Sequence, residues 1–178
     1  MTLVDYFNTP ETVLPQELVD GVMFVREAPS VYHQRSLFRL GVALQEHADA
    51  HSAGEILLAP VDIVLDSDRP LVLQPDLLFV GTARAHIVRE RVYGAPDLVV
   101  EILSPDCRIG RLDERVRWFA EYGVREIWLY HQLLERMEVL RCEAGQVVAR
   151  ESFWPSDRVD SRVLPPMTQT LGTILNVR

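Results

Sequence analysis

Apolar and polar positions follow two periods along the chain, and the clearest signal is a nearly unbroken apolar run at 97–103. Its sequence, Asp-Leu-Val-Val-Glu-Ile-Leu, is typical of a central strand that is buried on both faces. Apolar residues at helical spacing predict two helices. The first covers about 31–51 with Ser30 as its N-cap, and the second covers about 111–122 with Gly123 in the left-handed conformation at its end.

Shorter segments complete the predicted order of elements. The dipeptide Asp20-Gly21 predicts a tight hairpin turn between two short strands. A loop is expected at 104–110, and a short helix near Leu171. The other expected strands, rich in aliphatic residues and bounded by turn residues, are 55–59, 61–65, 71–80, 126–130, 137–140 and 147–149. This order predicts an α/β (α+β) protein with one central sheet flanked by helices.

The length of 178 residues fits a single domain over 1–178. No apolar run approaches the ~20 residues that a membrane span needs. The first residues lack the basic and apolar regions of a signal peptide. Two cysteines are too few for a disulfide framework. We therefore expect a cytoplasmic protein that does not contact membranes.

The formal charge of -8 argues against a protein that coats nucleic acid non-specifically. The chain has no lysine, so all 18 of its basic residues are arginine. Several arginines gather in the middle of the chain, namely Arg84, Arg89, Arg91, Arg108, Arg111, Arg115, Arg117 and Arg125. Such a strip can either follow a phosphate backbone or belong to solvated helix faces.

Glu101 is the most informative polar residue, because it lies in the middle of the predicted central strand with apolar neighbours on both sides. Burial of an ionised carboxylate is costly unless a cation or hydrogen-bond donors compensate it. Two interpretations follow. Glu101 is either a ligand of a metal ion, or one half of a buried ion pair with Arg115 or Arg125.

Asp76 is the candidate for a second carboxylate, because it directly precedes the apolar segment 77–80. Its Pro-Asp context is weak support, since Asp97 also follows a proline. We prefer Asp76, because the strand that begins at Leu77 can pair with the strand that carries Glu101. Carboxylates on neighbouring strands can share Mg²⁺ or Mn²⁺, which polarises a phosphoryl oxygen and activates water.

Three segments of the chain resemble the Uma-type family of restriction-endonuclease-like proteins. They are Gly94-Ala-Pro-Asp-Leu-Val-Val-Glu-Ile-Leu-Ser-Pro105, Gln74-Pro-Asp-Leu-Leu-Phe-Val80 and Tyr122-Gly-Val-Arg-Glu-Ile-Trp-Leu129. The resemblance covers about residues 15–150 and implies a PD-(D/E)xK nuclease fold with a mixed sheet between helices. It also implies that Asp76 and Glu101 bind the metal, with the main-chain carbonyl of Ile102 as a third ligand.

The sequence departs from this family at the catalytic lysine. In the superfamily the lysine lies two residues after the glutamate, which is Leu103 here. In the family it comes from the following helix, at the position of Arg115. Leu112, Arg115 and Phe119 share one helix face, so Arg115 is expected to point inward. An arginine can stabilise transition-state charge, but it cannot accept a proton as a general base.

Weaker candidates complete the predicted pocket. They are His33, Gln34, Asp62 and Ser104, each of which also fits an ordinary polar role at a helix start, a strand surface or a turn. His47 and His51 are spaced to clamp a metal, but no third ligand converges with them in the sequence.

Two functions remain open at this point. The first is a Mg²⁺-dependent endonuclease that hydrolyses DNA phosphodiester bonds, with Asp76, Glu101 and Arg115 as its catalytic residues. The second is a catalytically impaired member that binds nucleic acid or protein. We further expect DNA as the substrate and a homodimer as the assembly.

Overall fold

The structure is a computed structural model that describes residues 1–10, 14–103 and 111–177. Its larger sheet has six strands among the described residues, in the order β11-β10-β9-β8-β6-β3. These strands are β3 Gly54–Leu58, β6 Leu77–Gly81, β8 Leu98–Leu103, β9 Glu126–His131, β10 Arg136–Glu143 and β11 Gln146–Phe153. The sheet is mixed, because β8 pairs antiparallel with β6 and parallel with β9.

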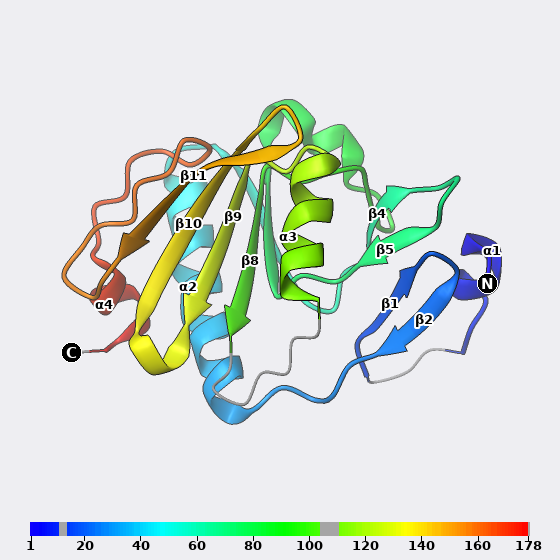
Figure 1. The fold of residues 1–178 in the computed structure, drawn as a ribbon. Coiled ribbons are helices and arrows are strands. Elements are labelled where there is room, and N and C mark those ends of the chain that lie inside the picture. The colour runs from blue at the N-terminus through cyan, green and yellow to red at the C-terminus, as the bar shows by residue number, and fades with distance from the viewer. Residues whose placement is uncertain (11–13, 104–110, 178) are drawn as a thin grey trace.

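A smaller sheet lies beside the first and has the order β2-β1-β5-β4-β7 among the described residues (Figure 1). Its strands are β1 Gln16–Val19, β2 Val22–Val25, β4 Ile63–Asp66, β5 Leu71–Leu73 and β7 Val92–Tyr93. The hairpin predicted at Asp20-Gly21 is confirmed, since both residues have positive φ angles of 47° and 79°.

The predicted fold class, an α/β (α+β) arrangement with a mixed sheet flanked by helices, is confirmed, but the expectation of one sheet is wrong. The segment 71–80 is not one strand. It divides into β5 and β6, which belong to different sheets. Pro75 lies at the division, and a proline has no N–H to donate to a strand ladder.

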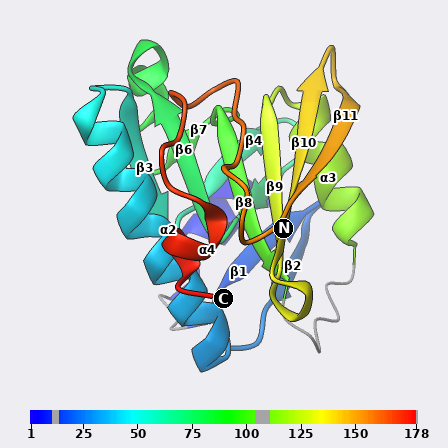
Figure 2. The same ribbon diagram turned by 90° about the vertical axis from the view of Figure 1, so that its left-hand side faces the viewer.

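Helices cover both faces of the larger sheet. Figure 2 shows α2 (Val31–Ala50) on one side of it and α3 (Leu112–Glu121) on the other. The predicted cap of α2 is confirmed, because Ser30 Oγ accepts a hydrogen bond of 3.2 Å from the backbone N–H of His33. The remaining helical segments are α1 Leu3–Phe7, α4 Leu171–Leu175, and the 3-10 turns η1 Thr82–Ile87 and η2 Gln132–Leu134.

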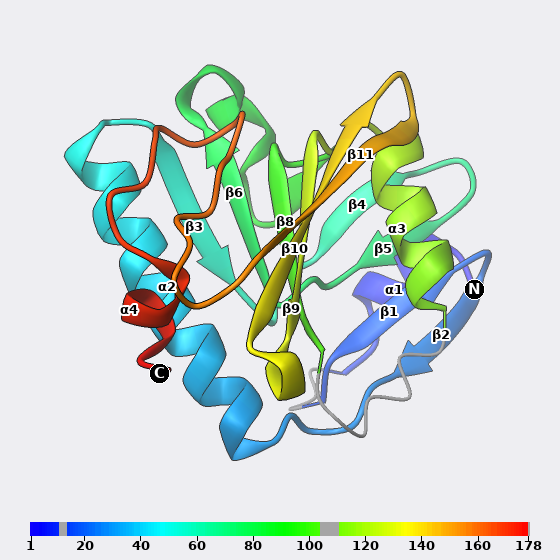
Figure 3. The same cartoon turned by 60° about the vertical axis from the view of Figure 1, so that its left-hand side comes forward.

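Side chains of β8 alternate between two apolar layers, as expected for a strand buried on both faces. Leu98, Val100 and Ile102 pack in the layer that contains α2 and α4, whereas Val99 packs with α3 and the smaller sheet. Figure 3 shows α3 over the face of the larger sheet that is turned toward the smaller one. Glu101 alternates with Val100 and Ile102, so its side chain belongs to the α3 side.

The register between β6 and β8 brings the two predicted carboxylates to the same level. Leu77 pairs with Val100 in this antiparallel ladder. One step along each strand brings residue 76 next to residue 101. No helix among the described residues is long and apolar enough to cross a membrane.

Candidate functional site

Asp76 lies directly before β6, and only 6% of its surface is exposed. Its Oδ2 atom accepts a hydrogen bond of 2.7 Å from the backbone N–H of Ile102 and lies 3.1 Å from Nε2 of His33. The first contact ties Asp76 to the strand that carries Glu101, and the second ties it to α2. The other oxygen, Oδ1, accepts no hydrogen bond from the described residues.

Glu101 lies in the middle of β8 and is 1% exposed. Its Oε1 atom accepts hydrogen bonds from Arg115, at 3.2 Å from Nε and also from Nη2. Its Oε2 atom is buried and has no hydrogen-bond partner among the described residues. Burial raises the pKa of the Glu101 carboxyl above its ordinary value, and the nearby charge of Asp76 adds to this rise while Arg115 opposes it. The site therefore has an acceptor that a cation could use.

Arg115 points inward from α3, as its spacing with Leu112 and Phe119 predicts, and is 4% exposed. It lies between two carboxylates. Its Nη1 atom donates to both oxygens of Glu17, at 2.6 and 2.7 Å, while its other edge faces Glu101. Burial alone would lower the pKa of the guanidinium, but Glu101 and Glu17 together raise it above its ordinary value. Arg115 is therefore a permanent buried cation.

Glu101 forms the ion pair that the second interpretation predicts, and its partner is Arg115. Arg125 pairs with Asp97 instead. Arg125 lies 3.4 Å from Asp97 and its side chain is 58% exposed. The two interpretations of Glu101 are compatible, because the ion pair uses Oε1 and leaves Oε2 without a partner.

Glu17 of β1 is the residue that the sequence analysis missed. It is 6% exposed and accepts a hydrogen bond of 2.8 Å from the backbone N–H of Gln74, in addition to those from Arg115. A signal was present, since Glu17 directly precedes the apolar pair Leu18-Val19 in a strand. The strand has only four residues, which is too short to show that its carboxylate faces inward.

Arg26 lies at the edge of this cluster and follows β2. Its Nη1 atom donates to the backbone carbonyl of Gln74 at 3.2 Å and lies 3.9 Å from Glu17. Its side chain is 30% exposed, compared with 5% for Arg115. Arg26 therefore offers positive charge to solvent beside the buried carboxylates, which Arg115 does not.

The weaker pocket candidates are placed differently. His33 is buried against Asp76, whereas Gln34 is exposed on α2. Asp62 accepts a hydrogen bond of 2.8 Å from the side chain of Gln74 and lies 3.3 Å from Arg91, so it contacts the edge of the cluster rather than Glu101. Ser104 lies outside the described residues.

Asp97, the alternative to Asp76, lies just before β8 and has its own partners. Its Oδ2 atom accepts a hydrogen bond of 2.9 Å from the N–H of Gly81, and Oδ1 faces Arg125 and Arg84. Glu101 lies four positions after Asp97 along an extended chain, which corresponds to roughly 13 Å. The structure therefore brings Asp76, and not Asp97, next to Glu101.

The central arginines that the structure describes do not form an open basic strip. Within the described part of the chain most of them face a carboxylate: Arg84 and Arg125 face Asp97, Arg91 faces Asp62, Arg111 faces Glu114, Arg115 faces Glu17 and Glu101, and Arg117 faces Glu121. Arg89 stacks on Tyr93, and Arg108 lies outside the described residues. Because nearby carboxylates neutralise most of these arginines, we favour the interpretation that they belong to solvated faces. A strip that follows a phosphate backbone would need unpaired charge.

Elsewhere among the described residues there is no competing metal centre. His47 contacts the backbone carbonyl of Pro165, and His51 contacts that of His47, so the pair does not converge on a common point. No group of three or more His, Cys, Asp or Glu side chains in the described ranges is arranged to hold a metal. An ion at Asp76 and Glu101 would therefore need main-chain, water or substrate oxygens, which Mg²⁺ accepts readily.

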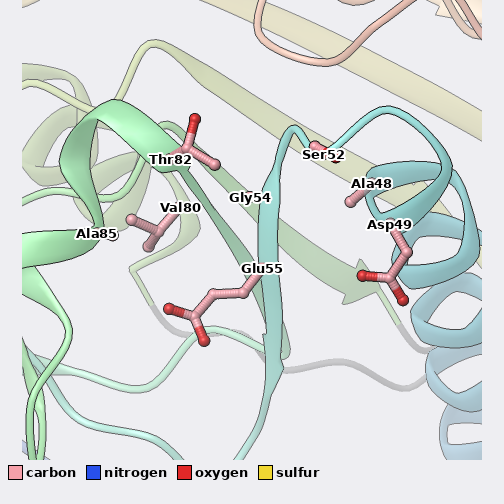
Figure 4. A pocket seen from close by; sticks show the side chains of 8 residues that line it. All are labelled: Ala48, Asp49, Ser52, Gly54, Glu55, Val80, Thr82 and Ala85. Atoms are coloured by element: carbon pink, nitrogen blue, oxygen red, sulfur yellow. The ribbon is translucent and has the colours of Figure 1, made fainter.

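The pocket shown in Figure 4 lies away from these carboxylates, between the end of α2, β3 and η1. It has a volume of about 340 Å³, and its polar lining includes Asp49, Glu55 and Thr82. None of the residues around Asp76 and Glu101 lines it. The pocket and the carboxylate cluster are therefore separate features.

Comparison with known proteins matches almost the whole chain to one protein family. The sequence model named Uma2 and described as "Putative restriction endonuclease" matches residues 3–177. Among solved structures, "a putative nuclease belonging to DUF820" from Anabaena variabilis ATCC 29413 has a TM-score of 0.81 at 17% identity, over 99% of this chain and 98% of that chain. At such low identity the likeness shows the fold alone. No curated protein matches the chain significantly.

Proposed function

The chain belongs to the Uma2 restriction-endonuclease family, and on that basis we propose that it is an endonuclease that uses Mg²⁺ or Mn²⁺ to hydrolyse DNA phosphodiester bonds. One observation carries this proposal. Two buried carboxylates lie at adjacent positions of neighbouring strands, and one of them, Glu101, keeps an oxygen that has no partner among the described residues. A buried acceptor without a donor is costly, and a cation would remove that cost.

Asp76 and Glu101 would hold the cation, with the main-chain carbonyl of Ile102 as a third ligand. If a divalent ion were bound by these residues, it would polarise a phosphoryl oxygen and lower the pKa of an attacking water. The hydrogen bond from Ile102 and the contact with His33 orient the Asp76 carboxylate before any ligand arrives. Preorganised ligands of this kind reduce the reorganisation that binding would otherwise require.

Arg115 would supply fixed positive charge behind Glu101. It cannot serve as a general base, because a guanidinium stays protonated. Its side chain is 5% exposed and bound on both edges, so it acts on the substrate through Glu101 rather than by direct contact.

Arg26 would meet the DNA backbone. It is the more exposed of the two cations near the carboxylates, with 30% of its side chain accessible. A guanidinium binds phosphate oxygens through two parallel hydrogen bonds, which suits a rim position in a nuclease.

A second candidate function follows from the missing lysine. Where the family has a lysine, this chain has an arginine held between Glu17 and Glu101, and a guanidinium cannot accept a proton. A protein with this site could bind metal and DNA without cleavage. The acidic charge of -8 also favours such a limited role.

The test is a plasmid-nicking assay with Mg²⁺ and Mn²⁺ titrated from zero to millimolar concentration. An endonuclease should convert supercoiled DNA to nicked or linear forms only with metal, and Asp76→Asn should remove the activity. Asp97→Asn is the matched control, since it changes an aspartate that follows a proline but lies away from Glu101. Metal-dependent DNA binding without nicking would favour the second candidate.

The assembly and the location stay predictions from the sequence. A homodimer, as expected for this protein, would have about twice the chain mass of 20.3 kDa in light scattering.

A further inference from the structure

Glu17 has no assigned role, although it is a buried carboxylate that shares Arg115 with Glu101. We infer that Glu17 is a positioning residue that draws Arg115 away from Glu101 and so leaves one Glu101 oxygen free for a cation. This inference rests on the proposed function, because it concerns the same metal site. It assigns Glu17 a role through Arg115 and not a direct one.

The contacts of Arg115 divide between its two edges. Nη1 donates to Oε1 and Oε2 of Glu17 at 2.6 and 2.7 Å. Nε and Nη2 both converge on a single oxygen of Glu101, Oε1, with Nε at 3.2 Å. The arginine therefore engages both oxygens of Glu17 but only one oxygen of Glu101.

This division follows from the number of donors. A guanidinium has five N–H groups in a rigid plane, and each of them needs an acceptor when it is buried. Arg115 is 4% exposed, so water cannot satisfy these donors. Without the Glu17 carboxylate, Nη1 would lose both acceptors. The unpartnered acceptor beside the guanidinium is Oε2 of Glu101. A planar arginine readily pairs with both oxygens of a carboxylate, and that pairing would occupy the atom that a metal needs.

Other contacts also hold the Glu17 carboxylate in place, so it does not move toward Glu101 with the arginine. The backbone N–H of Gln74 donates to Glu17 Oε1 at 2.8 Å, and Gln74 lies two residues before Asp76. Arg26 lies 3.9 Å from the same oxygen. The segment that presents Asp76 therefore also holds Glu17, which couples the position of Arg115 to that of the first carboxylate.

The experiment measures Mn²⁺ affinity by isothermal titration calorimetry on the full chain. Glu17→Gln should raise the Kd for Mn²⁺ about 10-fold or more, which equals about 1.4 kcal/mol. The double variant E17Q/R115M removes the negative charge of Glu17 and the positive charge of Arg115 together. No arginine then competes for the oxygens of Glu101, so the Kd for Mn²⁺ should return to within about three-fold of the wild type. This recovery is the readout that a purely structural Glu17 would not give. Circular dichroism and melting temperatures establish that each variant is folded.

The outcomes separate this inference from the proposed function. If the wild type binds no Mn²⁺, the proposed metal site fails and this inference fails with it. If the wild type binds Mn²⁺ and E17Q binds equally well but melts earlier, Glu17 is structural and the inference alone is overturned. A folded double variant that binds no better than E17Q shows that Glu17 acts on the metal directly, which also overturns it. If E17Q does not fold, a folded double variant with a Kd within about three-fold of the wild type supports the inference, and one that binds Mn²⁺ much more weakly overturns it.

Discussion

The Oδ2 atom of Asp76 lies 2.7 Å from the backbone nitrogen of Ile102, the residue directly after Glu101. A backbone donor at that distance fixes the carboxylate to the neighbouring strand independently of any flexible side chain. The spacing of the two carboxylates is thus set by the β6–β8 ladder. Since the fold itself brings these like charges together, a cation that binds between them should act on the stability of the whole protein.

Divalent metal should raise the melting temperature. An ion that binds the native pair Asp76 and Glu101 but not the unfolded chain stabilises the fold by about 2.7 kcal/mol at ~100 times its Kd. Differential scanning fluorimetry with Mg²⁺, Mn²⁺ and a chelator checks this. A melting temperature that does not change at millimolar metal would contradict the site.

Glu101→Gln should abolish the stabilisation by metal at a small cost to the metal-free protein. Glutamine can still accept a hydrogen bond from Arg115, and it removes a carboxylate whose ionisation is opposed by burial and by Asp76. Arg115→Met, in contrast, leaves Glu17 and Glu101 without their cation and should cost about 3–5 kcal/mol. Chemical denaturation without metal compares the two. If E101Q is as destabilising as R115M, Glu101 serves mainly in the ion pair.

The sequence was sufficient to predict the elements that carry the site. The apolar run of β8, the Ser30 cap of α2 and the inward position of Arg115 all depend on local spacing, which a single sequence records directly. The assignment of strands to sheets depends on long-range pairing. The segment 71–80 therefore looked continuous, although β5 and β6 separate at Pro75.

The missed residue has a similar explanation. The role of Glu17 depends on Arg115, which lies almost 100 positions away in the chain, and the four-residue strand β1 gives no clear period. The choice between Asp76 and Asp97 also required tertiary contacts, since both follow a proline. The hydrogen bond from Gly81 and the arginines at Asp97 distinguish them, and neither feature is visible in a local pattern.

Cys142 should be unreactive in the native protein. Burial first, and the charge of Glu126 second, raise the pKa of its thiol to about 11 from the ordinary value of 9.0. The fold therefore favours the protonated thiol, so its contribution to stability is present below pH 9 and is lost as the pH rises toward 11. A Cys107→Ser variant leaves Cys142 as the single cysteine. Its reaction with a thiol reagent at pH 8 should be slow, and urea should accelerate it strongly. Rapid labelling of the folded variant would contradict this burial.

Arg115→Lys tests the departure from the family at the catalytic position. Lysine is a compact charge, whereas the guanidinium of Arg115 spans two carboxylates. If this position supplies transition-state charge through Glu101, Arg115→Lys should preserve or raise nicking, and Arg115→Ala should reduce it about 10²–10³-fold. Initial rates of plasmid nicking at saturating Mn²⁺ give this comparison.

The variants must be compared at matched stability, because either change removes hydrogen bonds from Glu17 and Glu101. A lysine cannot bridge both carboxylates with the five donors of an arginine, so R115K should melt below the wild type. Assays at a temperature well below the lowest melting point remove this difference. Equal nicking rates for the folded wild type, R115K and R115A would exclude Arg115 from catalysis. No nicking in all three, with Mn²⁺ stabilisation retained, would instead identify a metal-binding protein on a nuclease fold.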